Sequence, residues 1–122
     1  MMARIPVALI GVGAWGKVLA KAAASSDKIE FVCCVGRNPE RLSAFSRDTG
    51  ISARDFDAVL ADKNISCVVI ALPNELHFEF ARRAAAAGKH VYIEKPIANT
   101  MTDALAIAAL ERVHGVRIVV GH

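Results

Sequence analysis

Continuous apolar runs that alternate with alanine-rich segments of helical spacing are the feature that most constrains this fold. The runs are rich in β-branched residues and show no apolar-polar alternation, which is typical of strands covered on both faces. They lie at residues 5–11, 29–36, 66–72, 90–94 and 116–121. Helical spacing occurs at 14–25, 39–49, 75–87 and 101–113, and a short helix is expected at 55–62, with room for a minimal strand near Ile51. This order predicts the α/β class: a doubly wound parallel sheet of about six strands with helices on both faces.

Helix-end residues agree with this prediction. Asn38 is expected to cap the helix at 39–49, with Pro39 at its first position, where a missing N–H costs nothing. Gly88 stands where the helix at 75–87 should stop.

Composition limits the function classes. The 122 residues are 54% hydrophobic and 22% charged, which suits one domain with one core. The net charge is +3, and the lysines and arginines are spread along the chain in ones and twos, so no nucleic-acid patch is expected. The apolar N-terminal run is interrupted by three glycines and Lys17, and no stretch reaches the length of a membrane span. We therefore expect neither export nor a membrane anchor.

The cysteines and histidines indicate no metal centre. Cys33, Cys34 and Cys67 lie in apolar runs without CxxC spacing, so we interpret them as reduced core residues of a cytoplasmic protein. The histidines also lack metal-ligand spacing: His77, His90, His114 and His122.

A glycine motif directly follows the first apolar run. Gly11, Gly13 and Gly16 have GxGxxG spacing, and a helix opens at Ala14 and Trp15. In a strand-turn-helix unit the first glycine permits the tight turn, the second lets a pyrophosphate approach, and the third allows close packing. The free N–H groups of the helix N-terminus favour phosphates. A Rossmann dinucleotide site is predicted, against the alternative that the glycines serve only a turn.

The tip of the second strand bears on which cofactor binds. About 20 residues beyond the motif an acidic side chain would hold the ribose of NAD. This chain instead has Gly36, Arg37 and Asn38 there. Glycine leaves room for a 2′-phosphate and arginine can bind it, which favours NADP over NAD. Arg41 is either a second cation or a solvated helix residue, and Arg37 has the alternative of a plain surface charge.

Three longer stretches together resemble one family. "VALIGVGAWGK", "VGRNPERL" and "ALPNELHFEFARRAAAAGKHVYIEKPIA" are similar, in order and spacing, to the N-terminal domain of the glucose-fructose oxidoreductase, inositol dehydrogenase and rhizopine-catabolism oxidoreductases. The resemblance covers nearly the whole chain. It implies an NAD(P)-dependent oxidoreductase acting on sugars, polyols or related carbonyl compounds.

The resemblance also implies roles for particular residues. Lys95 of "EKP" would be the catalytic lysine, while Glu94 and Pro96 would shape the turn beside the nicotinamide. A cis Lys95-Pro96 peptide bond is compatible with this resemblance. The stretch "LPNELH" would line the cofactor through Leu72, Pro73, Asn74 and His77.

The chain departs from this family in length. Members carry a second α/β domain with the substrate pocket and further catalytic residues, typically an Asp and a His. We therefore expect residues 1–122 to be the cofactor domain alone, inactive by itself. A non-catalytic dinucleotide-binding or sensing module is the alternative, which retention of Lys95 disfavours. A methyltransferase is disfavoured because Gly36 replaces the acidic residue expected to hold its cofactor.

Overall fold

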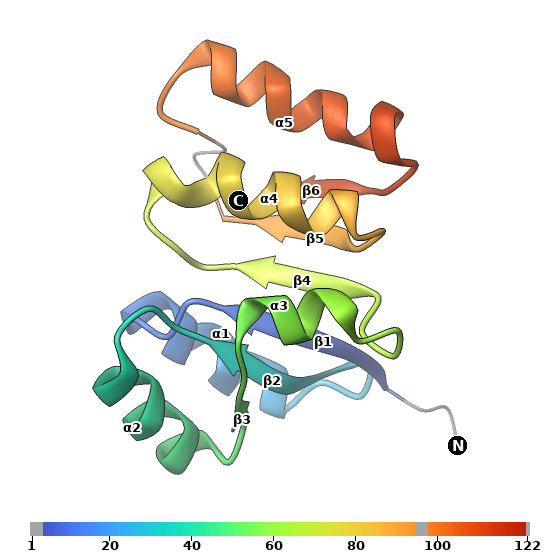
Figure 1. Cartoon of the computed structure of the whole chain (residues 1–122). Helices are drawn as coiled ribbons and strands as arrows, with labels where there is room; N and C mark the ends of the chain where they lie inside the picture. The colour runs from blue at the N-terminus through green and yellow to red at the C-terminus, as the bar shows by residue number, and fades with distance from the viewer. Residues whose placement is uncertain (1–3, 95–97, 122) are drawn as a thin grey trace.

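One parallel sheet organises the chain. The computed structural model describes residues 4–94 and 98–121, which form a six-stranded sheet in the order β3-β2-β1-β4-β5-β6 (Figure 1). The strands are β1 Ile5–Ile10, β2 Ile29–Val35, β3 Ser52–Ala53, β4 Cys67–Ile70, β5 His90–Ile93 and β6 Ile118–Val120. The helices are α1 Ala14–Ala24, α2 Pro39–Thr49, α3 Phe56–Ala61, the 3₁₀ turn η1 Asn74–Leu76, α4 His77–Ala86 and α5 Met101–His114. The predicted doubly wound α/β fold is confirmed.

The sheet has a separate core on each face. On one face Leu9, Phe31 and Phe45 belong to a cluster that includes residues of α1 and α2. On the other, Ile10, Val59 and Ile107 belong to a cluster that includes residues of α3, α4 and α5. Both faces of the sheet therefore carry helices, as the continuous apolar runs predicted.

The carboxyl ends of three central strands lie level. Ile10 of β1 pairs with Val35 of β2 on one side and with Ile70 of β4 on the other. The chain continues from β1 and β4 towards opposite edges of the sheet, which makes the gap between them a topological switch point. Ligands in sheets of this kind bind outside the strand ends at such a point.

Local chemistry explains the ends of α2. The Asn38 carboxamide oxygen accepts hydrogen bonds from the backbone N–H groups of Glu40, at 3.0 Å, and Arg41, at 3.1 Å. Pro39 is the first helical residue, as predicted. The fourth helix differs from the expectation of 75–87, because residues 74–76 form the 3₁₀ turn η1 and the α-helix begins only at His77.

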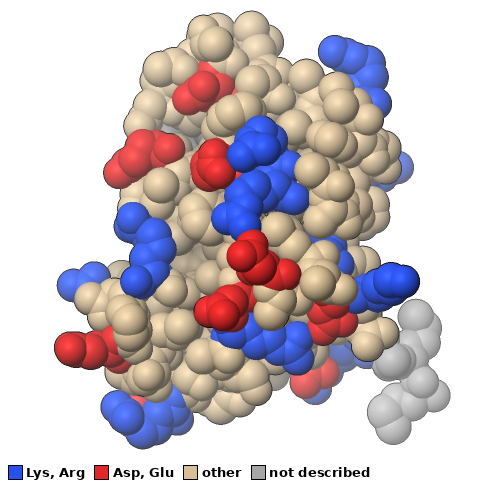
Figure 2. All heavy atoms as spheres, viewed as in Figure 1, with Lys and Arg blue, Asp and Glu red and all other residues tan. Residues whose placement is uncertain are grey.

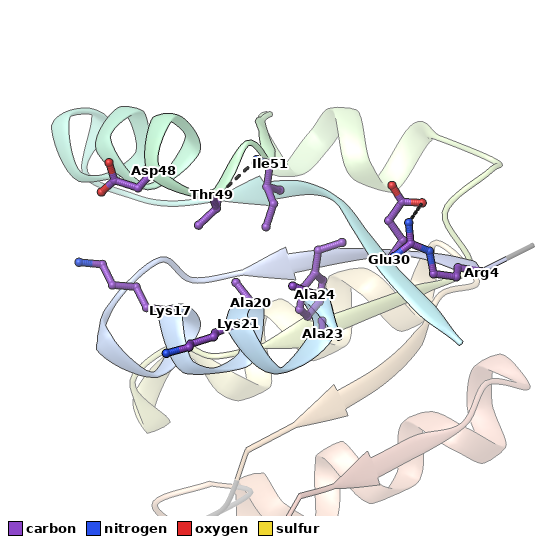
Figure 3. Close-up of a pocket in the computed structure, with 11 residues that line it drawn as sticks. Arg4, Lys17, Ala20, Lys21, Ala23, Ala24, Glu30, Asp48, Thr49 and Ile51 are labelled. Carbon is purple, nitrogen blue, oxygen red and sulfur yellow. Dashed lines mark hydrogen bonds and ion pairs between the residues drawn. The ribbon is translucent and has the colours of Figure 1, made fainter. Parts of the chain in front are cut away.

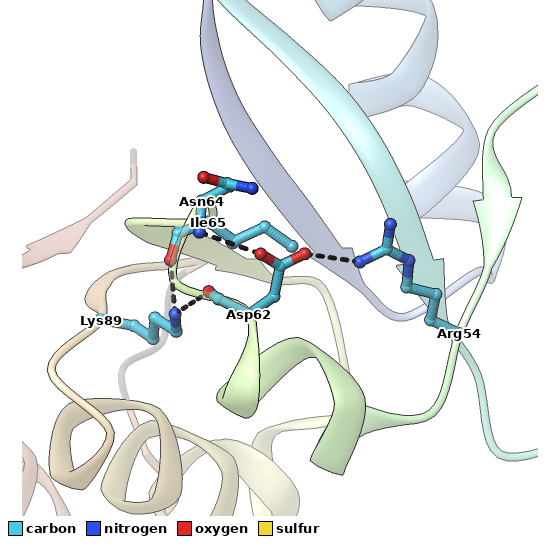
Figure 4. A network of polar contacts seen from close by, with 5 residues as sticks. All are labelled: Arg54, Asp62, Asn64, Ile65 and Lys89. Atoms are coloured by element: carbon cyan, nitrogen blue, oxygen red, sulfur yellow. Dashed lines mark hydrogen bonds and ion pairs between the residues drawn. The ribbon is translucent and has the colours of Figure 1, made fainter.

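A buried lysine links two loops at the amino ends of the strands. Lys89 is 5% exposed, and its ammonium donates hydrogen bonds of 2.5 Å to the carbonyl oxygens of Asp62 and Ile65 (Figure 4). The Asp62 carboxylate in turn accepts a hydrogen bond from Arg54 at 2.7 Å, and this bond is the largest cause that lowers the pKa of Asp62. Lys89 thus joins the loop before β5 to the loop before β4.

Replacing Lys89 with methionine is expected to lower the free energy of unfolding by roughly 2–4 kcal/mol, because one buried and one partly buried carbonyl oxygen lose their donor. Urea denaturation measures this loss. Lys63→Met is the matched control, since Lys63 is an exposed lysine beside the same loop. A loss no larger than that of the control would show that the buried ammonium adds no stability.

The cysteines are free thiols. Cys33 and Cys34 are fully buried, as expected, whereas Cys67 is only half-buried. Burial raises the pKa of Cys34 to about 11, with a smaller contribution from Cys33, and burial also raises the pKa of Cys67. These thiols are therefore protonated at neutral pH and poor nucleophiles.

Surface charge is mixed. On the face drawn in Figure 2, lysine and arginine side chains lie interspersed with acidic ones. Across the described residues, no helix is both long and apolar enough to cross a membrane. In the same part of the chain, no group of three or more His, Cys, Asp or Glu side chains is placed to hold a metal ion.

Candidate functional site

The loops that follow β1, β2 and β4 enclose one hollow of about 210 Å³ at the carboxyl ends of the strands. The sequence predicted these three segments separately, and the fold brings them together. The lining residues are Gly11, Val12, Gly13, Gly36, Arg37, Asn38, Arg41, Ala71, Leu72 and Pro73. A neighbouring hollow of about 400 Å³ shares Val12, Gly13 and Arg41 and extends between α1 and α2.

The three motif glycines have distinct surroundings. Gly11 has φ +116°, and a Cβ there would lie 2.4 Å from the carbonyl oxygen of Ala71. A Cβ on Gly16 would lie 2.5 Å from the carbonyl oxygen of Gly11. A Cβ on Gly13 would meet nothing within 4 Å. The first and third glycines are therefore required by packing, whereas Gly13 faces open space where a ligand could approach.

The N-terminus of α1 is open towards this space. Gly13 is its N-cap residue, no side chain caps the helix, and the first turn holds no acidic residue. The first N–H groups of a helix have no partner within the helix and carry a partial positive charge. Ala14 and Trp15 form this first turn, and Trp15 is 49% exposed. The arrangement suits an anion.

Two arginines lie beyond β2, Arg37 in the loop that follows it and Arg41 in the first turn of α2. Arg37 and Arg41 both line the hollow and are exposed, and within the described chain neither makes an ion pair. Gly36 is close-packed beneath the hollow, because a Cβ there would lie 2.8 Å from Cγ2 of Val12 and 3.4 Å from the Leu42 side chain. The carboxamide oxygen of Asn38 is occupied in capping α2, so this side chain shapes the loop as well as lining the hollow.

Of the predicted "LPNELH" residues in and after the loop that follows β4, some line the hollow and others do not. Leu72 and Pro73 line the hollow, whereas Asn74 starts the turn η1 and is not among the lining residues. His77 is 1% exposed, and its Nε2 lies 2.9 Å from the carbonyl oxygen of Leu72. His77 therefore sits behind the lining loop rather than on its surface.

The end of β5 is described only as far as Glu94. The predicted catalytic Lys95 and the turn residue Pro96, with the bond between them, lie outside the described residues. The Tyr92 hydroxyl donates a hydrogen bond to Glu94. Burial raises the pKa of Tyr92, and the Glu94 carboxylate raises it further through its charge and this bond.

A larger hollow of about 460 Å³ lies elsewhere, between α1, the end of α2 and the start of β2 (Figure 3). Arg4 and Glu30 pair across part of it at 3.7 Å. Arg4 precedes β1 and Glu30 is the second residue of β2, so this hollow opens near the amino ends of these strands. In the described part of the chain, none of the loops that follow the carboxyl ends of the strands lines this larger hollow. We therefore place the candidate site at the smaller hollow.

Sequence reasoning missed two lining residues, Val12 and Ala71. Val12 occupies a variable position of the glycine motif, and Ala71 precedes the proline-containing stretch. Neither has reactive chemistry, so only the contact of the β1 and β4 loops shows that they line the hollow.

A doubly wound sheet with a glycine-rich first turn is the architecture of a Rossmann-type α/β protein. The chain belongs to the oxidoreductase family with an NAD-binding Rossmann fold, whose model matches residues 5–122. This is the glucose-fructose oxidoreductase, inositol dehydrogenase and rhizopine-catabolism family, so the predicted resemblance is confirmed. The family binds nicotinamide dinucleotides.

Two curated relatives illustrate the range of the family. The 2,7-anhydro-N-acetylneuraminate hydratase of Escherichia coli is 33% identical over 115 residues, which cover 93% of this chain and 30% of the relative. The inositol 2-dehydrogenase of Rhizobium meliloti is 36% identical over 89 residues, 73% of this chain and 27% of the relative. The chain thus spans about a third or less of the length of these relatives.

Solved structures agree with the fold and differ in cofactor. A candidate NADPH-dependent oxidoreductase from Desulfitobacterium hafniense matches with a TM-score of 0.95 and 32% identity, over 100% of this chain and 36% of that chain. A protein of gentamicin A biosynthesis in complex with NAD matches with a TM-score of 0.91 and 29% identity, over 99% of this chain and 35% of that one.

Proposed function

We propose that this chain is the NADP(H)-binding domain of an oxidoreductase that transfers hydride between the nicotinamide and a sugar, polyol or related carbonyl compound. The observation that carries the proposal is that the Gly11-Gly13 turn, the open end of α1 and Arg37, which makes no ion pair with the described residues, line one hollow. The substrate class is supported by the inositol 2-dehydrogenase among the relatives. Free thiols are typical of reducing compartments, and we place the protein in the cytoplasm on that ground.

Each part of the hollow has a task in this proposal. The α1 N-terminus and the Gly13 backbone bind the pyrophosphate, because both offer N–H groups without a blocking side chain. The space beside Gly36 and Arg37 takes the 2′-phosphate of the adenosine ribose. Leu72 and Pro73 form the opposite wall.

Lys95 takes the catalytic role in this proposal. In a longer enzyme its ammonium would give a proton or hydrogen bond to the substrate oxygen as hydride moves. The substrate pocket and the remaining catalytic residues belong to a second domain, so residues 1–122 bind cofactor without turnover.

Calorimetry with NADPH and NADH tests the cofactor site on the chain itself. We expect at least NADPH to bind, and Gly13→Ala to weaken that binding by tenfold or more, because a methyl group would stand where the pyrophosphate approaches. Gly13→Ala should cost at most about 1 kcal/mol of stability, since glycine is the better N-cap and the new Cβ meets nothing within 4 Å. Absence of heat with both cofactors at millimolar concentration would refute the proposed function.

A further inference from the structure

Two polar or charged side chains are buried in the described part of the chain, Lys89 and His77. Lys89 is accounted for by the two loops that it joins. His77 opens α4 and lies directly behind the wall of the candidate cofactor site. Its Nε2 is 2.9 Å from the carbonyl oxygen of Leu72. A carbonyl oxygen only accepts, so Nε2 carries the hydrogen and donates it.

The Leu72 carbonyl is a sensitive point of the site. Ala71, one residue earlier, donates a 2.7 Å hydrogen bond to Ile10, which ties the start of this loop to β1. Leu72 Cδ2 would lie 3.3 Å from a Cβ on Gly11, so the loop packs directly against the glycine turn. Any rotation of the Leu72 peptide would therefore shift the wall formed by Leu72 and Pro73.

The end of this loop is fixed by the helix that follows it. The Leu76 N–H donates to the Pro73 carbonyl oxygen at 3.0 Å within η1, and α4 begins at His77. The imidazole reaches back from the first residue of α4 across five residues to Leu72. This hydrogen bond links the two ends of the loop, which is attached to α4 at one end and to the sheet at the other.

We propose that His77 is a positioning residue of the cofactor site: its Nε2–H holds the Leu72 carbonyl and so fixes the Leu72-Pro73 wall against the adenosine half of the dinucleotide. His77 does not touch the cofactor. The inference rests on the proposed function, because it assigns to this wall the ligand named there.

The test compares two substitutions of His77 by their effect on binding of 2′,5′-ADP, the adenosine end of NADP. His77→Leu fills most of the volume but donates no hydrogen bond, and should weaken binding roughly threefold to tenfold, the usual range for one neutral hydrogen bond. His77→Gln supplies an amide donor and should restore affinity to within about twofold of the unchanged protein, on the same principle. If His77 affected only the stability of the fold, the amide donor of His77→Gln would not restore affinity for 2′,5′-ADP.

Lys89→Met is the control for stability. Its loops lie at the amino ends of the strands, so it should lower the unfolding midpoint without changing affinity for 2′,5′-ADP where the variant is folded. If His77→Leu lowers the midpoint but binds 2′,5′-ADP like the unchanged protein, the positioning role is refuted while the cofactor site stands. If the unchanged chain binds neither 2′,5′-ADP nor NADPH, the proposed function fails and this inference fails with it.

A second measurement needs no substitution. The ring-nitrogen NMR spectrum of the unchanged protein should show His77 with its hydrogen on Nε2. A spectrum with the neutral ring protonated on Nδ1 instead would overturn the inference even if the leucine variant does not fold.

Discussion

Replacing Gly36 with aspartate and Arg37 with alanine is expected to reverse the preference of the chain for NADPH over NADH. In the unchanged protein the Arg37 guanidinium, free of any ion pair in the described structure, faces the hollow beside Gly36. A hydrogen bond to a charged group contributes roughly 1.5–3 kcal/mol, so NADPH should bind about 10- to 100-fold more tightly than NADH. The double variant removes this contact and adds a carboxylate that repels the 2′-phosphate and accepts from the ribose hydroxyls of NAD.

Dissociation constants for both cofactors, measured on the chain itself, give the result. Gly36→Ala is the matched control, because it adds the same Cβ, 2.8 Å from the Val12 side chain, without any charge. The alanine variant should weaken both cofactors similarly or not at all. Unchanged protein that binds NADH as tightly as NADPH would show that Arg37 is an ordinary surface residue.

Arg41 also bears on the preference for NADPH over NADH. It lines both adjoining hollows and makes no ion pair in the described structure. The sequence left it open as a second cation or a solvated helix residue, and its place on the first turn of α2 puts it within the region that the 2′-phosphate would occupy. We therefore propose a supporting role for Arg41 beside Arg37.

Periodicity made most of the fold predictable. The apolar runs and helical segments match the observed elements because strands buried on both faces must be apolar at every position. The start of α4 was harder to predict from the sequence. The 3₁₀ turn η1 depends on the loop geometry after Pro73, which local helix propensity does not determine. The minimal strand β3 near Ile51 was predictable from the room left between two helices.

Several residues that line the hollow could be predicted from the sequence, but not how they are arranged. GxGxxG spacing identified three glycines, yet the sequence does not say that Gly11 must clear the Ala71 carbonyl. "LPNELH" pointed to His77 as a lining residue, whereas the fold turns its ring into the core behind Leu72. For Lys89 the sequence supported no prediction. Its carbonyl partners become neighbours only when the sheet forms.

Substitution of Gly11 by alanine is expected to lower the free energy of unfolding by about 3 kcal/mol or more. Two effects add: φ +116° is a conformation that costs other residues roughly 1–3 kcal/mol, and the new Cβ would meet a backbone carbonyl at 2.4 Å, an overpacking that typically costs about 1–3 kcal/mol. Neither backbone segment can move freely to relieve this contact. The Gly11 N–H donates a hydrogen bond to the Val35 carbonyl oxygen at 2.8 Å, and the Ala71 N–H donates one to the Ile10 carbonyl oxygen at 2.7 Å.

Gly13→Ala separates this packing effect from ligand binding. Urea denaturation should show a large loss for Gly11→Ala and a small one for Gly13→Ala, while calorimetry should show weakened NADPH binding for both. Gly16→Ala should resemble Gly11→Ala, because its Cβ would lie 2.5 Å from the Gly11 carbonyl oxygen. If all three variants lost the same stability, the glycines would serve only the turn. A Gly13→Ala chain that keeps full stability and loses the cofactor would instead identify residue 13 as the point where the pyrophosphate meets the backbone.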